Sequence, residues 1–121
     1  MRIAYIAPYQ GPGLISSRPI VRNLALAGNL KIELVAELLH QGGHDIEILS
    51  QGEVIERRFR IYSGFRERSP YHSKIPVYYA SVLPVKFVNI LWSSQRTLAL
   101  FKERHRAAPF DLVMIYNLKL P

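Results

Sequence analysis

The stretch that decides the fold reads RIAYIAP (2–8), a connection (9–29), LKIELVAELLHQ (30–41), GG (42–43) and HDIEIL (44–49). The first piece is almost wholly apolar and the last largely so, which is typical of buried parallel strands. The third piece has the 3.6-residue periodicity of an amphipathic helix, and the glycine pair ends it. Strand, helix and strand in this order predict a βαβ unit with a right-handed crossover.

The helix of this unit is expected over residues 30–41. Asn29 is suited to cap the free N–H groups of its first turn. A positive charge on His40 would suit the last turn, because the carboxyl end of a helix favours cations. We expect one buried apolar stripe and one polar stripe, formed by Leu34, Val35, Leu38 and Leu39, and by Glu33, Glu37 and Gln41.

The connection 9–29 is long for an α/β unit, in which such segments usually span about 2–6 residues. It leaves the carboxyl end of the first strand, where open α/β sheets bind ligands. Its glycines allow a close approach of backbone to a ligand, and its arginines add positive charge. The candidate cleft residues here are Gly11, Gly13, Arg18, Arg22, Gly28 and Asn29. The alternative is a surface loop that binds nothing.

The rest of the chain continues the α/β pattern. An arginine-rich edge strand is expected over 53–62, a loop over 63–74 and a short strand over 75–80. A second helix is expected from Ser81 to Arg106, with Pro84 in its first turn. Residues 111–117 are expected to form another buried parallel strand. The predicted fold class is α/β, a Rossmann-like, mostly parallel sheet with flanking helices.

Composition narrows the class of protein. The 121 residues fit one domain, and the absence of cysteine is consistent with a reducing cytosol. No basic segment followed by an apolar core begins the chain, so no signal peptide is expected, and no apolar run approaches the roughly 18–20 residues of a membrane span. We therefore expect a cytoplasmic protein, with peripheral attachment to a membrane as an alternative that the sequence leaves open.

The formal charge of +7 is unevenly distributed. Residues 1–56 hold four basic and six acidic residues, whereas residues 57–121 hold twelve basic and three acidic ones. Such asymmetry favours an anionic partner, with ordinary solubility as the alternative. Nucleic acid is an unlikely partner because no RNP, KH or helix-turn-helix pattern occurs. The candidate anionic-surface residues are Arg57, Arg58, Arg60, Arg66, Arg68, Lys86, Arg96, Lys102, Arg104 and Arg106.

Several cofactor motifs are missing. Gly11 and Gly13 would begin a G-x-G-x-x-G dinucleotide fingerprint, but residue 16 is a serine. No P-loop motif occurs. His40 and His44 straddle the helix end without a carboxylate or cysteine to complete a metal site, so we expect no metal and no bound cofactor.

The order of these segments resembles the N-terminal domain of family 4 glycosyltransferases. The resemblance rests on the opening MRIAYI (1–6), the glycine-bearing loop, Gly28-Asn29 before VAELL (35–39), GHDIEIL (43–49) and PFDLVMIYN (109–117). The individual motifs are degenerate, but their order and spacing span most of the chain. In the late strand, Met114 and Tyr116 stand where the family often has histidines.

This resemblance implies an incomplete N-terminal half of a GT-B fold, with residues 1–121 as the acceptor-side domain and the C-terminal donor-binding domain absent. The donor would be a nucleotide-sugar, and the cleft would include Tyr116 and Asn117 besides the loop residues. The family's donor motif has no counterpart in these residues, so no residue is assigned a catalytic role and the fragment alone is expected to be inactive. Some relatives dock on anionic membranes through this domain. A non-catalytic nucleotide- or phosphate-binding module and a membrane-surface adaptor are the alternatives.

Overall fold

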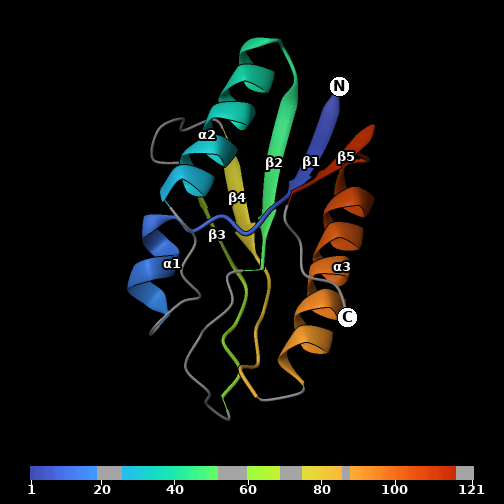
Figure 1. Cartoon of the computed structure of the whole chain (residues 1–121). Helices are drawn as coiled ribbons and strands as arrows, with labels where there is room; N and C mark the ends of the chain where they lie inside the picture. The colour runs from blue at the N-terminus through green and yellow to red at the C-terminus, as the bar shows by residue number, and fades with distance from the viewer. Residues whose placement is uncertain (19–25, 52–59, 69–74, 86–87, 117–121) are drawn as a thin grey trace.

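The computed structural model describes residues 1–18, 26–51, 60–68, 75–85 and 88–116. In this part of the chain a five-stranded sheet lies between two helical layers. Helices α1 and α2 cover one face and α3 covers the other (Figure 1). The elements are β1 (Arg2–Ile6), α1 (Pro12–Ser17), α2 (Leu26–Gln41), β2 (Asp45–Ser50), β3 (Phe65–Arg68), β4 (Pro76–Tyr79), α3 (Asn89–Ala107) and β5 (Leu112–Ile115).

The strand order across the sheet is β3-β4-β2-β1-β5. β1 pairs in parallel with both β2 and β5, and β2 pairs in parallel with β4. Only β3 is antiparallel, against β4. The four parallel strands follow the 3-2-1-4 order of Rossmann-type sheets, so the α/β class and the mostly parallel sheet are confirmed.

Helix α2 ends where the glycine pair predicts but begins four residues earlier than expected. Gly43 has a φ of 90°, and its N–H donates to the His40 carbonyl, which closes the helix. The buried stripe is Ile32 and Ala36 with Val35 and Leu39 beside them. Leu34 and Leu38 are exposed, so the expected stripe is wrong in these two positions. They project about 200° from Ile32 and Ala36 around the helix and miss the sheet.

The connection after β1 is not structureless, because Pro12–Ser17 form α1. Pro12 occupies the first helical position, where its missing N–H costs nothing and its φ suits the helix. Nearly half of the expected loop is therefore helical, counting the first turn of α2.

Two expectations in the middle of the chain are wrong. Residues 65–68, expected as loop, form β3, which pairs with β4. Alternate side chains of β3 point to opposite faces, so Phe65 and Glu67 face α1 while the arginines face the other side. The second helix begins at Asn89 rather than Ser81, because Val82 forms an antiparallel bridge with Tyr62. Most of the expected edge strand 53–62 lies outside the described residues.

The core is divided between the two faces of the sheet. Under α1 and α2 it centres on Tyr9, Leu14, Ile32, Ile48 and Tyr79. Under α3 it is smaller, and Ala4, Ile6, Leu49 and Phe110 form it. β5 is an edge strand and its apolar side chains are largely exposed, contrary to the expected buried strand.

Candidate functional site

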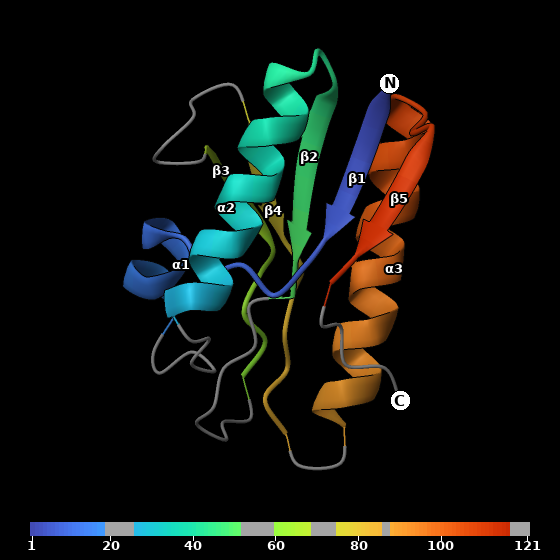
Figure 2. The same ribbon diagram turned by 45° about the horizontal axis from the view of Figure 1, so that its top comes forward.

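The segment after β1 is fixed residue by residue across the carboxyl ends of the strands. The Ala7 N–H donates to the Leu49 carbonyl (3.0 Å), and the Ser50 hydroxyl donates to the Tyr9 carbonyl (2.7 Å). The Tyr9 hydroxyl donates to a carboxylate oxygen of Glu33 (2.7 Å). Figure 2 shows this segment passing the end of β2 on its way to α1. These hydrogen bonds hold residues 7–9 in fixed positions at the carboxyl ends of the strands, which is the part of an α/β sheet where ligands bind.

Asn29 locks this segment to α2. Its side-chain oxygen accepts from the Gln10 N–H (3.0 Å) and its side-chain nitrogen donates to the Gln10 carbonyl (3.0 Å). The pair imitates one rung of a β-ladder. Asn29 therefore does not cap the helix as expected: it and Gly28 lie inside the first turn of α2, which begins at Leu26.

Tyr116 and Lys31 lie at the reversal of strand order, beside the ends of β1 and β5. The Tyr116 N–H donates to the Ile6 carbonyl (2.9 Å), which extends the β1–β5 pairing by one residue. The Lys31 ammonium stands 4.9 Å from the Tyr116 ring centroid. Burial, and secondarily the nearby Tyr116, raises the pKa of Tyr5. A half-buried aromatic ring with a cation over it is thus presented at this end of the sheet.

Gly11 and Gly13 contact the Glu67 side chain of β3. A Cβ at either position would overlap a carboxylate oxygen of Glu67. The Tyr79 hydroxyl donates to that carboxylate (2.8 Å) and accepts from the Gly11 N–H (2.9 Å). Burial and then the hydrogen bond to Glu67 raise the pKa of Tyr79, so this phenol stays protonated. The close backbone approach that glycine permits is made to the protein's own carboxylate.

Arg18 is a buried anchor between strand ends. Its guanidinium donates to the carbonyls of Gln51 (3.3 Å), Ser63 (3.2 Å) and Ala80 (2.8 Å). Gln51 follows β2 and Ala80 follows β4, so one side chain joins α1 to both strands. Burial lowers the pKa of Arg18 to about 10, which leaves it cationic at neutral pH.

The predicted cleft residues therefore form two groups. Gly11, Gly13 and Arg18 lie beside β3 and β4, and Asn29 is paired with Gln10 next to Gly11, whereas Tyr116 lies beside β1 and β5. β4 and β5 are three strand positions apart, or roughly 14 Å at the usual spacing of about 4.8 Å. Arg22 and Asn117 lie outside the described residues.

The basic residues are dispersed over several surfaces. Arg60 stands over Tyr62 (5.2 Å), Arg66 over Tyr78 (5.4 Å) and Arg96 over Trp92 (4.7 Å). Arg68 ends β3, while Lys102 and Arg106 are exposed on α3. Arg57, Arg58 and Lys86 lie outside the described residues.

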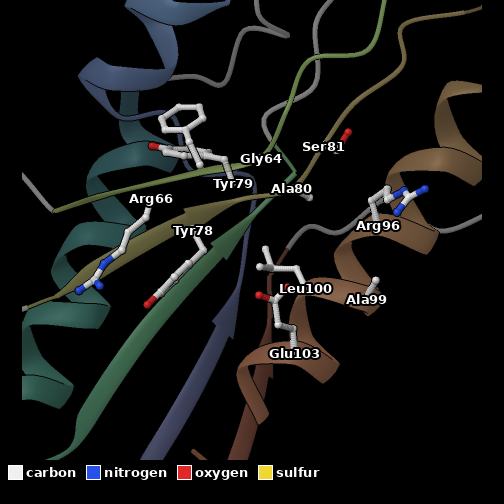
Figure 3. Close-up of a pocket in the computed structure, with 11 residues that line it drawn as sticks. Gly64, Arg66, Tyr78, Tyr79, Ala80, Ser81, Arg96, Ala99, Leu100 and Glu103 are labelled. Carbon is white, nitrogen blue, oxygen red and sulfur yellow. The ribbon is translucent and has the colours of Figure 1, made fainter. Parts of the chain in front are cut away.

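A cleft of about 370 Å³ separates β3 and β4 from α3. Figure 3 shows Tyr78 and Arg66 on one wall and Leu100 and Glu103 on the other, with Tyr79 on the opposite side of β4. The cleft combines an aromatic ring with charges of both signs.

Arg104 is committed to an internal ion pair. Its guanidinium donates to both Glu47 oxygens (2.8 and 3.1 Å), and Arg2 donates to one of them (2.8 Å). Burial alone would raise the pKa of Glu47, but the hydrogen bonds from Arg104 and Arg2 outweigh it and the pKa is lowered. Arg104 thus joins α3 to β2 rather than contributing a free positive charge.

Two features are absent from the residues that the structure describes. None of their helices is long and apolar enough to cross a bilayer. Within the same residues, no three His, Cys, Asp or Glu side chains converge as they would around a metal ion.

Several residues of the rim were not among the candidates taken from the sequence. Glu67 is brought to the glycines by β3, which was expected to be a loop, and Tyr79 lies on the neighbouring β4. Lys31 was not singled out. Alternation in FRER (65–68) was the available signal for β3, because it places Phe65 and Glu67 on one face.

Fold and site together define an α/β protein with a Rossmann-like sheet and a structured rim at the carboxyl ends of its strands. No known protein family, curated protein or solved structure matches this chain.

Proposed function

We propose that this chain is the N-terminal, acceptor-side half of a GT-B glycosyltransferase, a cytoplasmic enzyme that transfers a sugar from a nucleotide-sugar to an acceptor hydroxyl. The observation that carries the proposal is the reversal of strand order between β1 and β5, with Lys31 and Tyr116 at its carboxyl end. Such switch points are where open α/β sheets bind ligands. The resemblance of the strand and helix segments to family 4 glycosyltransferases supports the same reading.

In this proposal the rim binds the acceptor. The Tyr116 ring offers an apolar face to a sugar or similar ring, and Lys31 offers hydrogen bonds to hydroxyls. The donor and the reacting groups belong to a second domain facing this rim.

The exposed edge of β5 supports a larger assembly. Leu112, Val113 and Ile115 are exposed by 43%, 40% and 62%. Parallel sheets normally have their strands covered on both faces. A further strand and helix beyond β5 would give the edge the cover that such sheets have.

The direct test is an assay of the full-length gene product with a panel of nucleotide-sugars and saccharide acceptors. We expect turnover of at least one donor, and Tyr116→Ala to lower kcat/KM about tenfold, the scale of one lost contact. Tyr78→Ala is the matched control, because this tyrosine lies under α3 on the other face. Failure of every donor to react, by transfer or hydrolysis, would overturn the proposal.

A second candidate function is attachment to an anionic membrane surface. Exposed Leu91 and Leu98 lie on α3 together with Arg96, Lys102 and Arg106. Helices that combine apolar and basic side chains can lie in a bilayer interface. We expect sedimentation with anionic vesicles but not with neutral ones, and loss of sedimentation on Leu98→Glu. Equal absence of binding to both kinds of vesicle would exclude this function.

A further inference from the structure

A second pocket lies at the carboxyl ends of β2 and β4, away from the β1–β5 reversal. It has a volume of about 240 Å³, and its walls are the end of α1, residues 60–63 and the ring of Phe65. One ordered water needs only about 10–15 Å³, so the pocket has room for a small ligand. Among the described residues that line it, two are arginines, three carry hydroxyl groups and none is acidic.

Arg18 gives this pocket a positive charge in a fixed position. The residue is 4% exposed, and hydrogen bonds to three backbone carbonyls hold its guanidinium. The guanidinium also lies 5.6 Å from the centroid of the Phe65 ring. Because this group is already immobilised, a ligand near it costs little side-chain entropy.

Arg60 supplies a group that can contact a ligand directly, and Tyr62 lines the same pocket. The Arg60 side chain is exposed, and within the described part of the chain it forms no ion pair. The Tyr62 hydroxyl is buried and has no hydrogen-bond partner among the described residues. Two hydrogen bonds with Val82 (2.8 and 3.0 Å) fix the backbone of Tyr62. A buried hydroxyl without a partner is uncommon, and a ligand oxygen that reaches it would satisfy it.

We propose that this pocket binds a phosphoryl group, either as free phosphate or as part of a small phosphate ester. The pocket is lined by residues from the end of α1 and from the 60–63 segment, which include Ser17, Arg18, Arg60, Tyr62 and Ser63. A tetrahedral oxyanion accepts hydrogen bonds in several directions, whereas a carboxylate accepts them near one plane. Arginine is the preferred partner of phosphate because its donors form a planar fork.

This site does not depend on the proposed glycosyl transfer. It would bind phosphate whatever the β1–β5 rim accepts, and the two proposals can fail separately. If both hold, the chain carries two ligand sites along one rim of the sheet.

The test is titration of the chain with inorganic phosphate and with methyl phosphate. Binding is measured by calorimetry and by changes in the backbone amide NMR signals of Ser17 and Ser63. Sodium chloride and acetate at matched ionic strength are the controls. We expect saturable binding of one or both phosphates, with shifts at Ser17 and Ser63 that chloride and acetate do not produce. Tighter binding of methyl phosphate identifies an ester as the ligand, and tighter binding of inorganic phosphate identifies the free anion.

Variants distinguish a built site from general attraction to a basic protein. Arg60→Ala should weaken binding about tenfold or more, because it removes a charged hydrogen-bond donor from an exposed position. Tyr62→Phe should weaken it by a smaller factor without changing the charge. Arg106→Ala, an equal loss of charge at the exposed end of α3, should leave affinity unchanged. No saturation with either phosphate, or an equal loss with Arg60→Ala and Arg106→Ala, would overturn the proposal.

Discussion

The two edges of the sheet are built in opposite ways. The β3 edge reads Phe-Arg-Glu-Arg (65–68) and alternates between partly buried and exposed charged side chains. The β5 edge reads Leu-Val-Met-Ile (112–115), and no charged residue lies within it. Charges on an edge strand discourage pairing with another chain, whereas an apolar edge permits it. The comparison indicates that β3 is protected against pairing with a further strand, whereas β5 can accept one. We call β5 the open edge of the sheet.

The interactions that hold the two sides also differ. On the β3 side, Glu67, Tyr79 and Arg18 tie the strands to α1 through hydrogen bonds. On the β5 side, Arg2 and Glu47 are the central residues. Backbone groups of Arg2 exchange hydrogen bonds with Asp111 before β5, and its guanidinium contacts Glu47 of β2.

The largest effect is expected for Glu47→Ala. This change leaves Arg2 and Arg104 without their shared carboxylate, which should lower the free energy of unfolding by about 3 kcal/mol. The value is at the lower end of the usual range because both arginines are about a quarter exposed. Denaturant unfolding measures the loss, and hydrogen exchange should rise at β5 and α3 before it rises at β3.

Glu103→Ala is the control for this change, because Glu103 is an exposed carboxylate of α3, next to Arg104 in the chain. It should change stability by less than about 0.5 kcal/mol. Uniform exchange across both edges in Glu47→Ala would contradict the separation of the two sides.

The contribution of Glu47 to stability should depend on pH. Because the folded-state pKa of Glu47 lies below its ordinary value of 4.5, its contribution is present above that pH and is lost as the pH falls through the folded value. The stability difference between the wild type and Glu47→Gln should therefore be constant near neutral pH and narrow below 4.5. A difference that widens on acidification would show that this carboxylate is not held ionised.

The second-largest change in stability is expected on the β3 side of the sheet. Gly13→Ala would push against the Glu67 carboxylate, and this should cost about 1–3 kcal/mol. In a Glu67→Ala background the obstacle is gone, and the alanine should stabilise α1 by up to about 1 kcal/mol. A double-mutant cycle by thermal unfolding measures the change of sign, and additive effects would contradict the contact.

The smallest effect on stability is expected at the open edge. Ile115→Lys should change the free energy of unfolding by less than about 0.5 kcal/mol, because this side chain is exposed. It should also reduce self-association of the chain in sedimentation velocity, whereas Arg66→Ile at the other edge should increase it. If both variants sediment like the wild type, the statement that β5 permits pairing with another chain and β3 discourages it is contradicted.

Much of the fold could be predicted from local pattern. Apolar runs located β1, β2 and β5, and the glycine pair located the end of α2, because these signals lie within a few residues of the structure they specify. The start of α2 was mislocated because Asn29 has the chemistry of a cap but pairs with Gln10. The start of α3 was mislocated because the pairing of Val82 with Tyr62 spans 20 residues of sequence.

The rim could be predicted less well than the fold. The sequence indicated that backbone at Gly11 and Gly13 would approach a ligand closely, whereas the group found there is a side chain of the protein itself. The sequence could not identify that group as Glu67, which lies more than 50 residues away on a strand that was not expected. The locations of Arg18 and Tyr116 at opposite sides of the rim follow from the strand order, which no local pattern encodes.

The central place of β1 also affects how the chain comes to be folded. This strand is made before the other four described strands, yet one of its two neighbours is β5, and Arg2 and Asp111 are 109 residues apart. At ribosomal rates of about 5–20 residues per second, β1 waits roughly 5–20 s for that neighbour. Throughout that interval the side of β1 that will pair with β5 has no partner strand, so the nascent chain depends on β2 and α2 to shield β1 until β5 has been synthesised.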